Sequence, residues 1–250
     1  MRVANLFRIS LAGLLLWASL QGQQEQVLVA VASNFSEAAR SLIVEFQVST
    51  GKKVVPIFGS TGKLFAQIRN GAPFQAFLAA DRRRPELLQQ EGTGIAGTRF
   101  TYAIGQIALW GPAAQAPPGP STLQEAKFRH LAMANPKLAP YGVAARQTLV
   151  SLAVWDQIQV KLVFGENIAQ TFHFVENGSA GFGIVAYAQL LGRFGSDPET
   201  EFWLIPTKSH DPIEQQAILL SESPVARSFL DYLKGESARQ IVLEHGYLVP

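Results

Sequence analysis

The sequence contains no cysteine, and this absence excludes disulfide bonds, thiolate metal sites and a lipid-modified N-terminal cysteine. Long apolar runs are also scarce. The run ISLAGLLLWASL at residues 9–20 is too short to span a bilayer as a permanent anchor. The 4 histidines lie far apart and lack the spacing of a metal-binding motif. A metal centre built from side chains is therefore not expected.

The N-terminal segment has the layout of an export signal. Arg2 and Arg8 precede the apolar run, and small and polar residues follow it. This is the order found in secretory signal peptides. We predict a signal peptide over residues 1–22, with cleavage between Leu20 and Gln24. The mature protein is then expected in the bacterial periplasm.

The charge balance argues against a nucleic-acid partner. The full chain holds 21 lysines and arginines against 19 aspartates and glutamates. Two of the arginines and none of the acidic residues fall within residues 1–22, so removal of that segment leaves 19 charges of each sign. Without an overall positive field, no binding of nucleic acid is expected.

Apolar runs and helical patterns alternate along the chain, which predicts parallel sheet with helices on both faces. Asn34 is expected to cap the first helix, with Glu37 as its partner in the first turn. Residues 101–110 form a β-like run, and the stretch GPAAQAPPGP after it predicts a loop or linker. Strands are expected at residues 26–32, 53–58, 74–80, 130–134, 161–164, 182–186 and 215–220. Helices are expected from residue 34 to 51, and at 63–70, 143–154, 167–175, 225–234 and 237–245.

One segment, Gly59-Ser60-Thr61-Gly62-Lys63, is similar at first sight to a nucleotide-phosphate loop. The Walker phosphate loop, G-x-x-x-x-G-K-[ST], requires glycine where this chain has Ile57 and a hydroxyl residue where it has Leu64. Nucleotide binding is therefore excluded. A strand end, a turn with hydroxyls and a helix start remain, and such a junction can bind an anion. A helix cap without a ligand is the alternative.

The segment Ala32-Ser33-Asn34 repeats this arrangement, because a strand again gives way to a helix at a hydroxyl residue. Alone it would be an ordinary helix cap. The carboxyl ends of neighbouring parallel strands open on one edge of a sheet, and ligands of such sheets bind there. The two segments together predict an anion site.

Several further segments resemble a known family in order and spacing. These segments are AVASNFSEAARSL, FGSTGKLFAQIRNGAPFQAFLAAD, RFTYAIGQIALW, ANPKLAPYGVAARQTL, GFGIVAYAQL and FLDYLKGESARQIVLEHGY. They resemble the periplasmic molybdate-binding proteins of ABC importers over nearly the whole mature chain. The resemblance implies an α/β type II periplasmic-binding-protein fold, in which two lobes joined by two crossing hinge strands enclose a tetrahedral oxyanion. Lobe I is expected at residues 25–103 and 212–250, and lobe II at residues 104–211.

The resemblance also implies which groups bind the anion. Tyr187 stands one position beyond a tyrosine ligand of some family members, and alternation along a strand turns it away from the site. Lys63 follows the helix start and is expected to point to solvent. The implied oxyanion-binding groups are the hydroxyls of Ser33 and Thr61, with Ser60 beside them, and the backbone N–H groups of Asn34, Tyr141 and Ile168.

These groups predict a receptor and not an enzyme. Neutral donors at helix N-termini can hold a dianion without a buried counter-charge. No cofactor is expected. The same residues would contact the metal atom of molybdate or tungstate only through the oxygens of the anion. The expected function is an extracytoplasmic receptor, acting as a monomer, that delivers molybdate and tungstate to an ABC importer permease in the inner membrane. The alternatives are a receptor of the same fold for sulfate or phosphate, and, less favoured, an exported phosphate or sulfate ester hydrolase.

Overall fold

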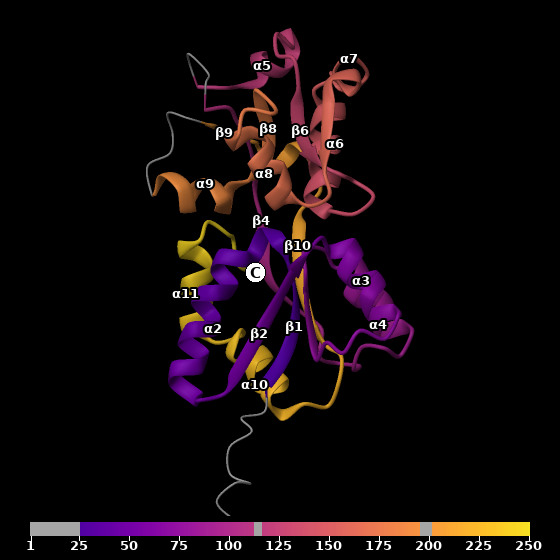
Figure 1. Cartoon of the computed structure of the whole chain (residues 1–250), viewed down its shortest axis with the longest axis vertical. Coiled ribbons are helices and arrows are strands. Elements are labelled where there is room, and N and C mark those ends of the chain that lie inside the picture. Colours follow the sequence, from indigo (N-terminus) through magenta and orange to yellow (C-terminus); the bar gives the residue numbers. More distant parts are fainter. Residues whose placement is uncertain (1–25, 113–116, 196–201) are drawn as a thin grey trace, which may run out of the picture.

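The computed structural model describes residues 26–112, 117–195 and 202–250, and the predicted signal peptide lies outside these ranges. Two α/β lobes, one above the other in Figure 1, make up the described chain, which crosses between them twice. Each lobe contains a five-stranded mixed sheet. The predicted two-lobed α/β fold is confirmed. No helix within these ranges is long and apolar enough to cross a membrane.

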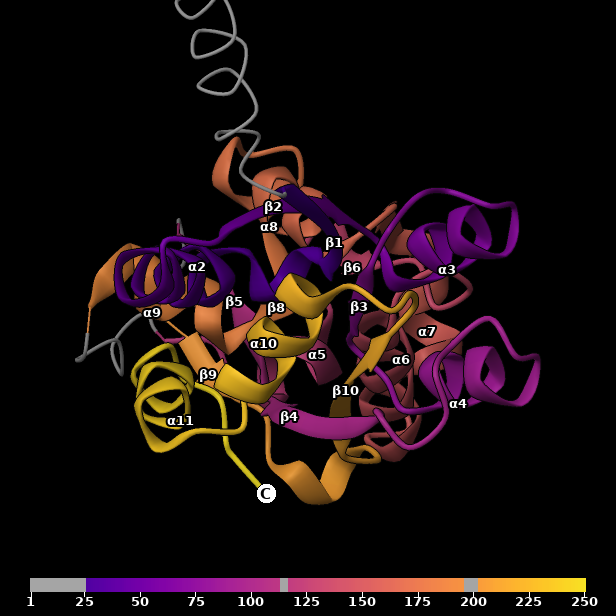
Figure 2. The same cartoon turned by 90° about the horizontal axis from the view of Figure 1, so that it is seen from below.

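Lobe I contains both ends of the described chain. Its strand order is β2-β1-β3-β10-β4, with β1 parallel to β2 and β3, and β10 antiparallel to β3 and β4. Figure 2 shows α2 and α11 on one side of this sheet and α3 and α4 on the other. The strands are β1 (Gln26–Ala32), β2 (Lys53–Gly59), β3 (Ala76–Ala79), β4 (Phe100–Gly105) and β10 (Ile213–Leu219). The helices are α2 (Ser36–Thr50), α3 (Thr61–Arg69), α4 (Arg83–Gln90), α10 (Pro224–Tyr232) and α11 (Glu236–Glu244).

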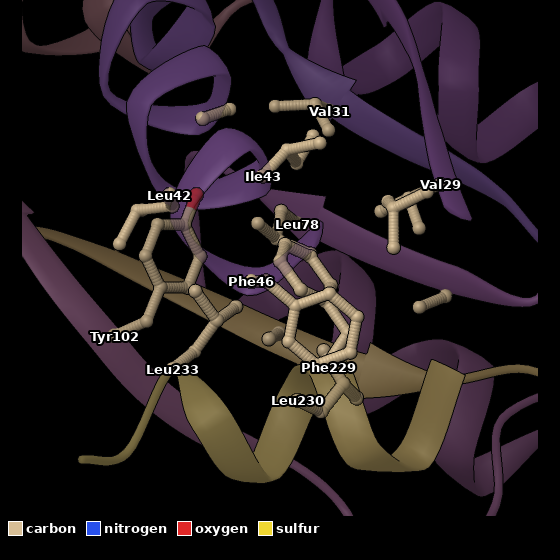
Figure 3. Packing of buried hydrophobic residues seen from close by; sticks show 14 of the residues in the cluster. Val29, Val31, Leu42, Ile43, Phe46, Leu78, Tyr102, Phe229, Leu230 and Leu233 are labelled. Carbon is tan, nitrogen blue, oxygen red and sulfur yellow. The ribbon is translucent and has the colours of Figure 1, made fainter. Parts of the chain in front are cut away.

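The apolar sequence of β1 explains why helices cover both faces of this sheet. Val29 and Val31 pack in one cluster with Phe46 of α2 and Phe229 of α10 (Figure 3). Ala30, which lies between the two valines, packs in a different cluster with residues of α3 and α4. Because successive side chains of a strand point to opposite faces, a continuous apolar run requires cover on both sides. The sheet is thereby fixed between two helical layers, and the ends of its strands remain free for a site.

Lobe II has the strand order β7-β6-β8-β5-β9. Its strands are β5 (Ile107–Trp110), β6 (Leu131–Ala134), β7 (Leu162–Gly165), β8 (Phe182–Ala186) and β9 (Phe202–Leu204). Its helices are α5 (Pro120–Glu125), α6 (Pro140–Ser151), α7 (Trp155–Ile158), α8 (Ile168–Glu176) and α9 (Tyr187–Phe194). Short 3-10 turns η2 (Gln159–Lys161) and η3 (Thr207–Ser209) complete the lobe and its return segment.

The two lobes are joined where the β-like run of residues 101–110 is divided. Gln106 separates β4, in the sheet of lobe I, from β5, in the sheet of lobe II. The chain returns between Leu204 and Ile213, and Figure 1 shows β4 and β10 at the waist of the molecule. These positions lie close to the predicted lobe boundaries, which remain a prediction. The stretch predicted as a linker lies inside lobe II, between β5 and α5, and its residues 113–116 are outside the described chain.

Several helices begin earlier than predicted, and for two of them the shift places a site residue in the first helical turn. α3 begins at Thr61 and not at residue 63. α6 begins at Pro140 and not at residue 143. Proline suits the first helical position, because its missing N–H would have no intrahelical partner there. Thr61 and Tyr141 are therefore helical residues, whereas the sequence pattern predicted them in loops.

The prediction that Asn34 caps the first helix is wrong. A 3-10 turn, η1 (Ser33–Phe35), follows β1, and α2 begins only at Ser36 with no side-chain cap. The side chain of Asn34 is buried and donates hydrogen bonds to residues of β10 and α6. Long-range partners therefore replace the local cap.

Candidate anion-binding site

A small cavity lies between the lobes, and every predicted site residue lines it. In this arrangement of the lobes the cavity is narrow, with a volume of about 10 Å³ and room for about one water molecule. The lining consists of Ala32, Ser33, Asn34, Gly59, Ser60, Thr61 and Ala80 from lobe I, and Ala139, Pro140, Tyr141, Asn167 and Ile168 from lobe II. The structure thus brings the predicted residues together, and their binding roles remain predictions.

Strand pairing explains how the lobe I residues meet. β1 and β2 are parallel, and their last residues, Ala32 and Gly59, are direct partners in the register. The hydroxyl residues that follow, Ser33 and Ser60, therefore leave the sheet side by side. Both are buried, as is Thr61 at the start of α3. The pairing of hydroxyls predicted from the two strand ends is a consequence of this register.

Backbone hydrogen bonds orient two of the hydroxyls. The N–H of Ala80 donates to Thr61 Oγ1 at 3.2 Å, and the N–H of Lys63 donates to Ser60 Oγ at 3.4 Å. Each oxygen therefore already accepts one hydrogen bond from the protein. The hydrogen of each hydroxyl remains free to be donated to a guest in the cavity.

Lobe II contributes the N-termini of two helices. Tyr141 is the second residue of α6 and Ile168 is the first residue of α8. The first N–H groups of a helix have no intrahelical acceptor. Asn167 caps α8 by accepting a hydrogen bond from the N–H of Gln170 at 2.9 Å, which orders the turn that carries Ile168. The lobe therefore offers backbone donors to the cavity.

The electrostatics of the cavity come from dipoles and not from charged side chains. None of the lining residues carries a charge. Helices α3, α6 and α8 all begin at the lining, and helix N-termini bear a partial positive charge. An oxyanion can be bound by such a site through hydrogen bonds alone.

The lobes contact each other around the cavity. The N–H of Gly62 donates to Leu138 O at 2.8 Å, and Lys63 forms a salt bridge with Glu166. A Cβ atom at Gly62 would lie 2.9 Å from Leu138 O, so a glycine is needed for this approach of the two backbones. Lys63 therefore joins the rims of the two lobes and does not line the cavity.

Tyr187 lies outside the cavity. It is the first residue of α9, so the strand alternation used to predict its direction does not apply. Its ring packs edge-on against Phe202 at a centroid distance of 5.6 Å. Its position away from the cavity follows from the start of a helix directly after β8.

A buried polar cluster beside the cavity was missed by sequence reasoning. It consists of Asn34, Tyr102, Tyr141, Gln215 and Tyr247, which are joined by side-chain hydrogen bonds. The sequence feature that could have indicated this cluster is Gln215, a residue with an amide side chain within the strand-like segment of residues 213–219. A buried polar side chain must find a hydrogen-bond partner, so this position indicated a polar cluster near the lobe crossing.

Comparisons with known proteins agree with this geometry. The chain is 42% identical over 244 residues to the molybdate-binding protein ModA of Azotobacter vinelandii, with 94% of each chain covered. It is 36% identical to the ModA protein of Rhodobacter capsulatus, covering 94% of this chain and 93% of that one. The structure of the Azotobacter vinelandii periplasmic molybdate-binding protein superposes with a TM-score of 0.84 at 35% identity, covering 90% of this chain and 99% of that one.

The fold is also shared with a more distant protein. The sulfate-binding protein SubI of Mycobacterium tuberculosis superposes with a TM-score of 0.74 at 11% identity, covering 90% of this chain and 86% of that one. This likeness concerns the fold alone. The family described as bacterial extracellular solute-binding protein matches residues 27–248. The chain therefore belongs to the family of bacterial extracellular solute-binding proteins.

Proposed function

We propose that this protein is a receptor that binds molybdate outside the cytoplasm and delivers it to the permease of an ABC importer. The observation that carries the proposal is an uncharged cavity between two lobes, lined by hydroxyls and helix N-termini. The molybdate-binding proteins that resemble this chain along almost their whole length support the choice of anion. The binding groups are Ser33, Ser60, Thr61, and the N–H groups of Asn34, Tyr141 and Ile168.

The donor character of the cavity favours a fully deprotonated anion. The hydroxyl oxygens of Ser60 and Thr61 each accept a backbone hydrogen bond, which leaves their hydrogens to be donated. A protonated anion such as hydrogen phosphate would place its own O–H against these donors and leave one of them unpaired. Molybdate carries no proton at neutral pH and meets every donor with an acceptor. Tungstate has the same charge and shape, and we include it as a ligand.

Sulfate is the alternative that these donors do not reject, because it is also a deprotonated dianion. The shared fold does not separate the two anions, since a sulfate-binding protein has the same arrangement of lobes. Discrimination then depends on the fit of the smaller sulfate ion to the closed cavity. The likeness to molybdate-binding proteins at 42% and 36% identity favours the larger ion.

Delivery to a permease requires that the loaded receptor differ in shape from the empty one. The anion bridges donors on both lobes, so it binds the closed arrangement more tightly than the open one and shifts the population toward closure. The crossings at Gln106 and between Leu204 and Ile213 are the hinges of this motion. The receptor acts in the periplasm as a monomer, without catalysis.

Titration calorimetry with molybdate, tungstate, sulfate and phosphate tests the proposal. We expect tight binding of molybdate and tungstate, and binding of sulfate and phosphate that is weaker by at least about 100-fold, or about 2.7 kcal/mol. A preference for sulfate would overturn the assignment of the ligand. Turnover of a phosphate or sulfate ester, with loss of turnover in Thr61→Ala, would overturn the assignment as a receptor.

A further inference from the structure

The buried polar cluster beside the cavity connects the two lobes through one side chain. Asn34 lies in η1, Tyr102 in β4, Gln215 in β10 and Tyr247 after α11, so these four belong to lobe I. Tyr141, from α6, is the member that comes from lobe II. Its hydroxyl accepts hydrogen bonds from Asn34 Nδ2 at 3.2 Å and from Gln215 Nε2 at 3.4 Å.

The rest of the cluster fixes the groups that Tyr141 meets. Asn34 Nδ2 also donates to Gln215 Oε1 at 2.7 Å, and the Tyr247 hydroxyl donates to the carbonyl of Asn34 at 2.5 Å. The single hydroxyl hydrogen of Tyr102 is shared between Ala79 O at 3.1 Å and Gln215 Oε1 at 3.3 Å. The 2.7 Å hydrogen bond from Asn34 to Gln215 by itself orients both amides, with an N–H of each directed at Tyr141.

The backbone at the lobe crossing leaves room for this hydroxyl. A Cβ atom at Gly105, the last residue of β4, would lie 2.3 Å from the Tyr141 hydroxyl oxygen and 3.1 Å from Gln215 Nε2. No side chain larger than hydrogen fits there while Tyr141 occupies its position. The glycine at the crossing and the tyrosine of α6 are therefore matched to each other.

Two members of the cluster also line the anion cavity, from opposite sides. Asn34 and Tyr141 both border the cavity, and their side chains meet in the cluster behind it. We propose that the Tyr141 hydroxyl is a positioning group that sets the spacing between the donors of lobe I and those of lobe II. This inference rests on the proposed function, because it assigns to the side chain of Tyr141 a role in the affinity of the anion site.

The hydroxyl suits such a role because it keeps one protonation state. Burial raises the pKa of Tyr141 well above the usual value for tyrosine, and the nearby phenols of Tyr247 and Tyr102 act in the same direction. The group stays neutral throughout the physiological pH range, so the contact between the lobes does not change with pH.

The variant Tyr141→Phe tests the inference, with Tyr102→Phe as its matched control. Both replacements remove one buried hydroxyl of the cluster that takes part in two hydrogen bonds, but both bonds of Tyr102 stay within lobe I. We expect Tyr141→Phe to weaken molybdate binding by about 5- to 30-fold, and Tyr102→Phe by less than about 2-fold. The two variants should lower the melting temperature of the ligand-free protein by similar amounts.

Stopped-flow fluorescence separates positioning from a general loss of stability. The loss in Tyr141→Phe should lie in a faster dissociation of molybdate, because the closed arrangement is the state that the hydroxyl supports. Unchanged affinity in Tyr141→Phe, or an equal loss of affinity in Tyr102→Phe, would overturn the inference.

Failure of the proposed function gives a different result. Wild-type protein that does not bind molybdate would overturn the choice of ligand before any variant is compared. The same two variants would then be measured with whichever of tungstate, sulfate or phosphate the wild type binds. An affinity difference between them would uphold the positioning role, and equal affinities would overturn it.

Discussion

Lobe I lines the cavity with the hydroxyl side chains of Ser33, Ser60 and Thr61 beside the backbone N–H of Asn34, whereas the proposed donors of lobe II are backbone N–H groups alone, at the starts of α6 and α8. On lobe I, a single substitution can delete a donor. On lobe II, most substitutions leave the N–H groups in place, and the donors are lost only when the helix start or the lobe spacing changes. The two sides should therefore respond to different kinds of mutation.

Thr61→Ala should have the largest effect among the single replacements at the cavity. It removes a hydroxyl donor to a charged ligand and also leaves the buried N–H of Ala80 without its acceptor. We expect a loss of about 2–3 kcal/mol in the binding free energy of molybdate, measured by titration calorimetry. Thr61→Ser keeps the hydroxyl and should stay within about 1 kcal/mol of the wild type. Equal affinities of the alanine and serine variants would contradict a role for this hydroxyl.

Ile168→Pro is the corresponding deletion on lobe II. Proline removes the N–H group but suits the first position of α8, and Asn167 before it already has the extended conformation that a following proline requires. We expect a loss of about 1–2 kcal/mol in molybdate binding, because one hydrogen bond to the charged ligand disappears.

The control for this change is Ile168→Val, which keeps the N–H group and shortens the buried side chain. The valine variant should lose some stability on thermal unfolding and retain the affinity of the wild type. If the proline and valine variants bind molybdate equally well, the N–H of Ile168 is not a ligand. Backbone donation from the start of α8 would then play no part in binding.

The same difference between the lobes explains how much the sequence could predict. Ser33 follows one apolar strand segment, and Ser60 with Thr61 follows the next, each at the point where helical structure begins. Their proximity was therefore predictable from local pattern and the geometry of parallel strands. The N–H groups of Tyr141 and Ile168, which we propose as donors, have no side-chain signature, because any residue other than proline supplies a backbone N–H. Only the resemblance to a known family indicated these positions.

The polar cluster could not be predicted from local sequence pattern for a different reason. Its hydrogen bonds join residues that are far apart in sequence, such as Asn34 and Gln215. Asn34 lies two residues after the end of β1, where asparagine is also typical of a helix cap. The predicted cap was wrong because the Asn34 amide instead donates hydrogen bonds to Tyr141 and Gln215. Sequence pattern therefore predicted the alternation of strands and helices and the lobe I side of the cavity. The family resemblance implied the two lobes and the lobe II positions, and the polar cluster is determined by tertiary contacts.

The rims of the lobes should contribute least to affinity. Lys63 and Glu166 form an ion pair across the rims, but their side chains are 52% and 40% exposed. Exposed pairs contribute about 0.2–1 kcal/mol and are screened by salt. We expect Lys63→Gln to weaken molybdate binding by at most about 5-fold at low ionic strength and by nothing measurable in about 1 M salt.

A double-mutant cycle with Glu166→Gln assigns this effect to the ion pair, because the second replacement should add no further loss. Lys137→Gln is the matched control: Lys137 also lies at the lobe rims, in a groove beside Arg84, and forms no ion pair within the described residues. Equal losses in Lys63→Gln and Lys137→Gln would indicate a general attraction of the anion and no specific pair. A loss above about 100-fold in Lys63→Gln that persists in high salt would instead make Lys63 a ligand, and the cavity would then depend on a charge from lobe I and not on dipoles alone.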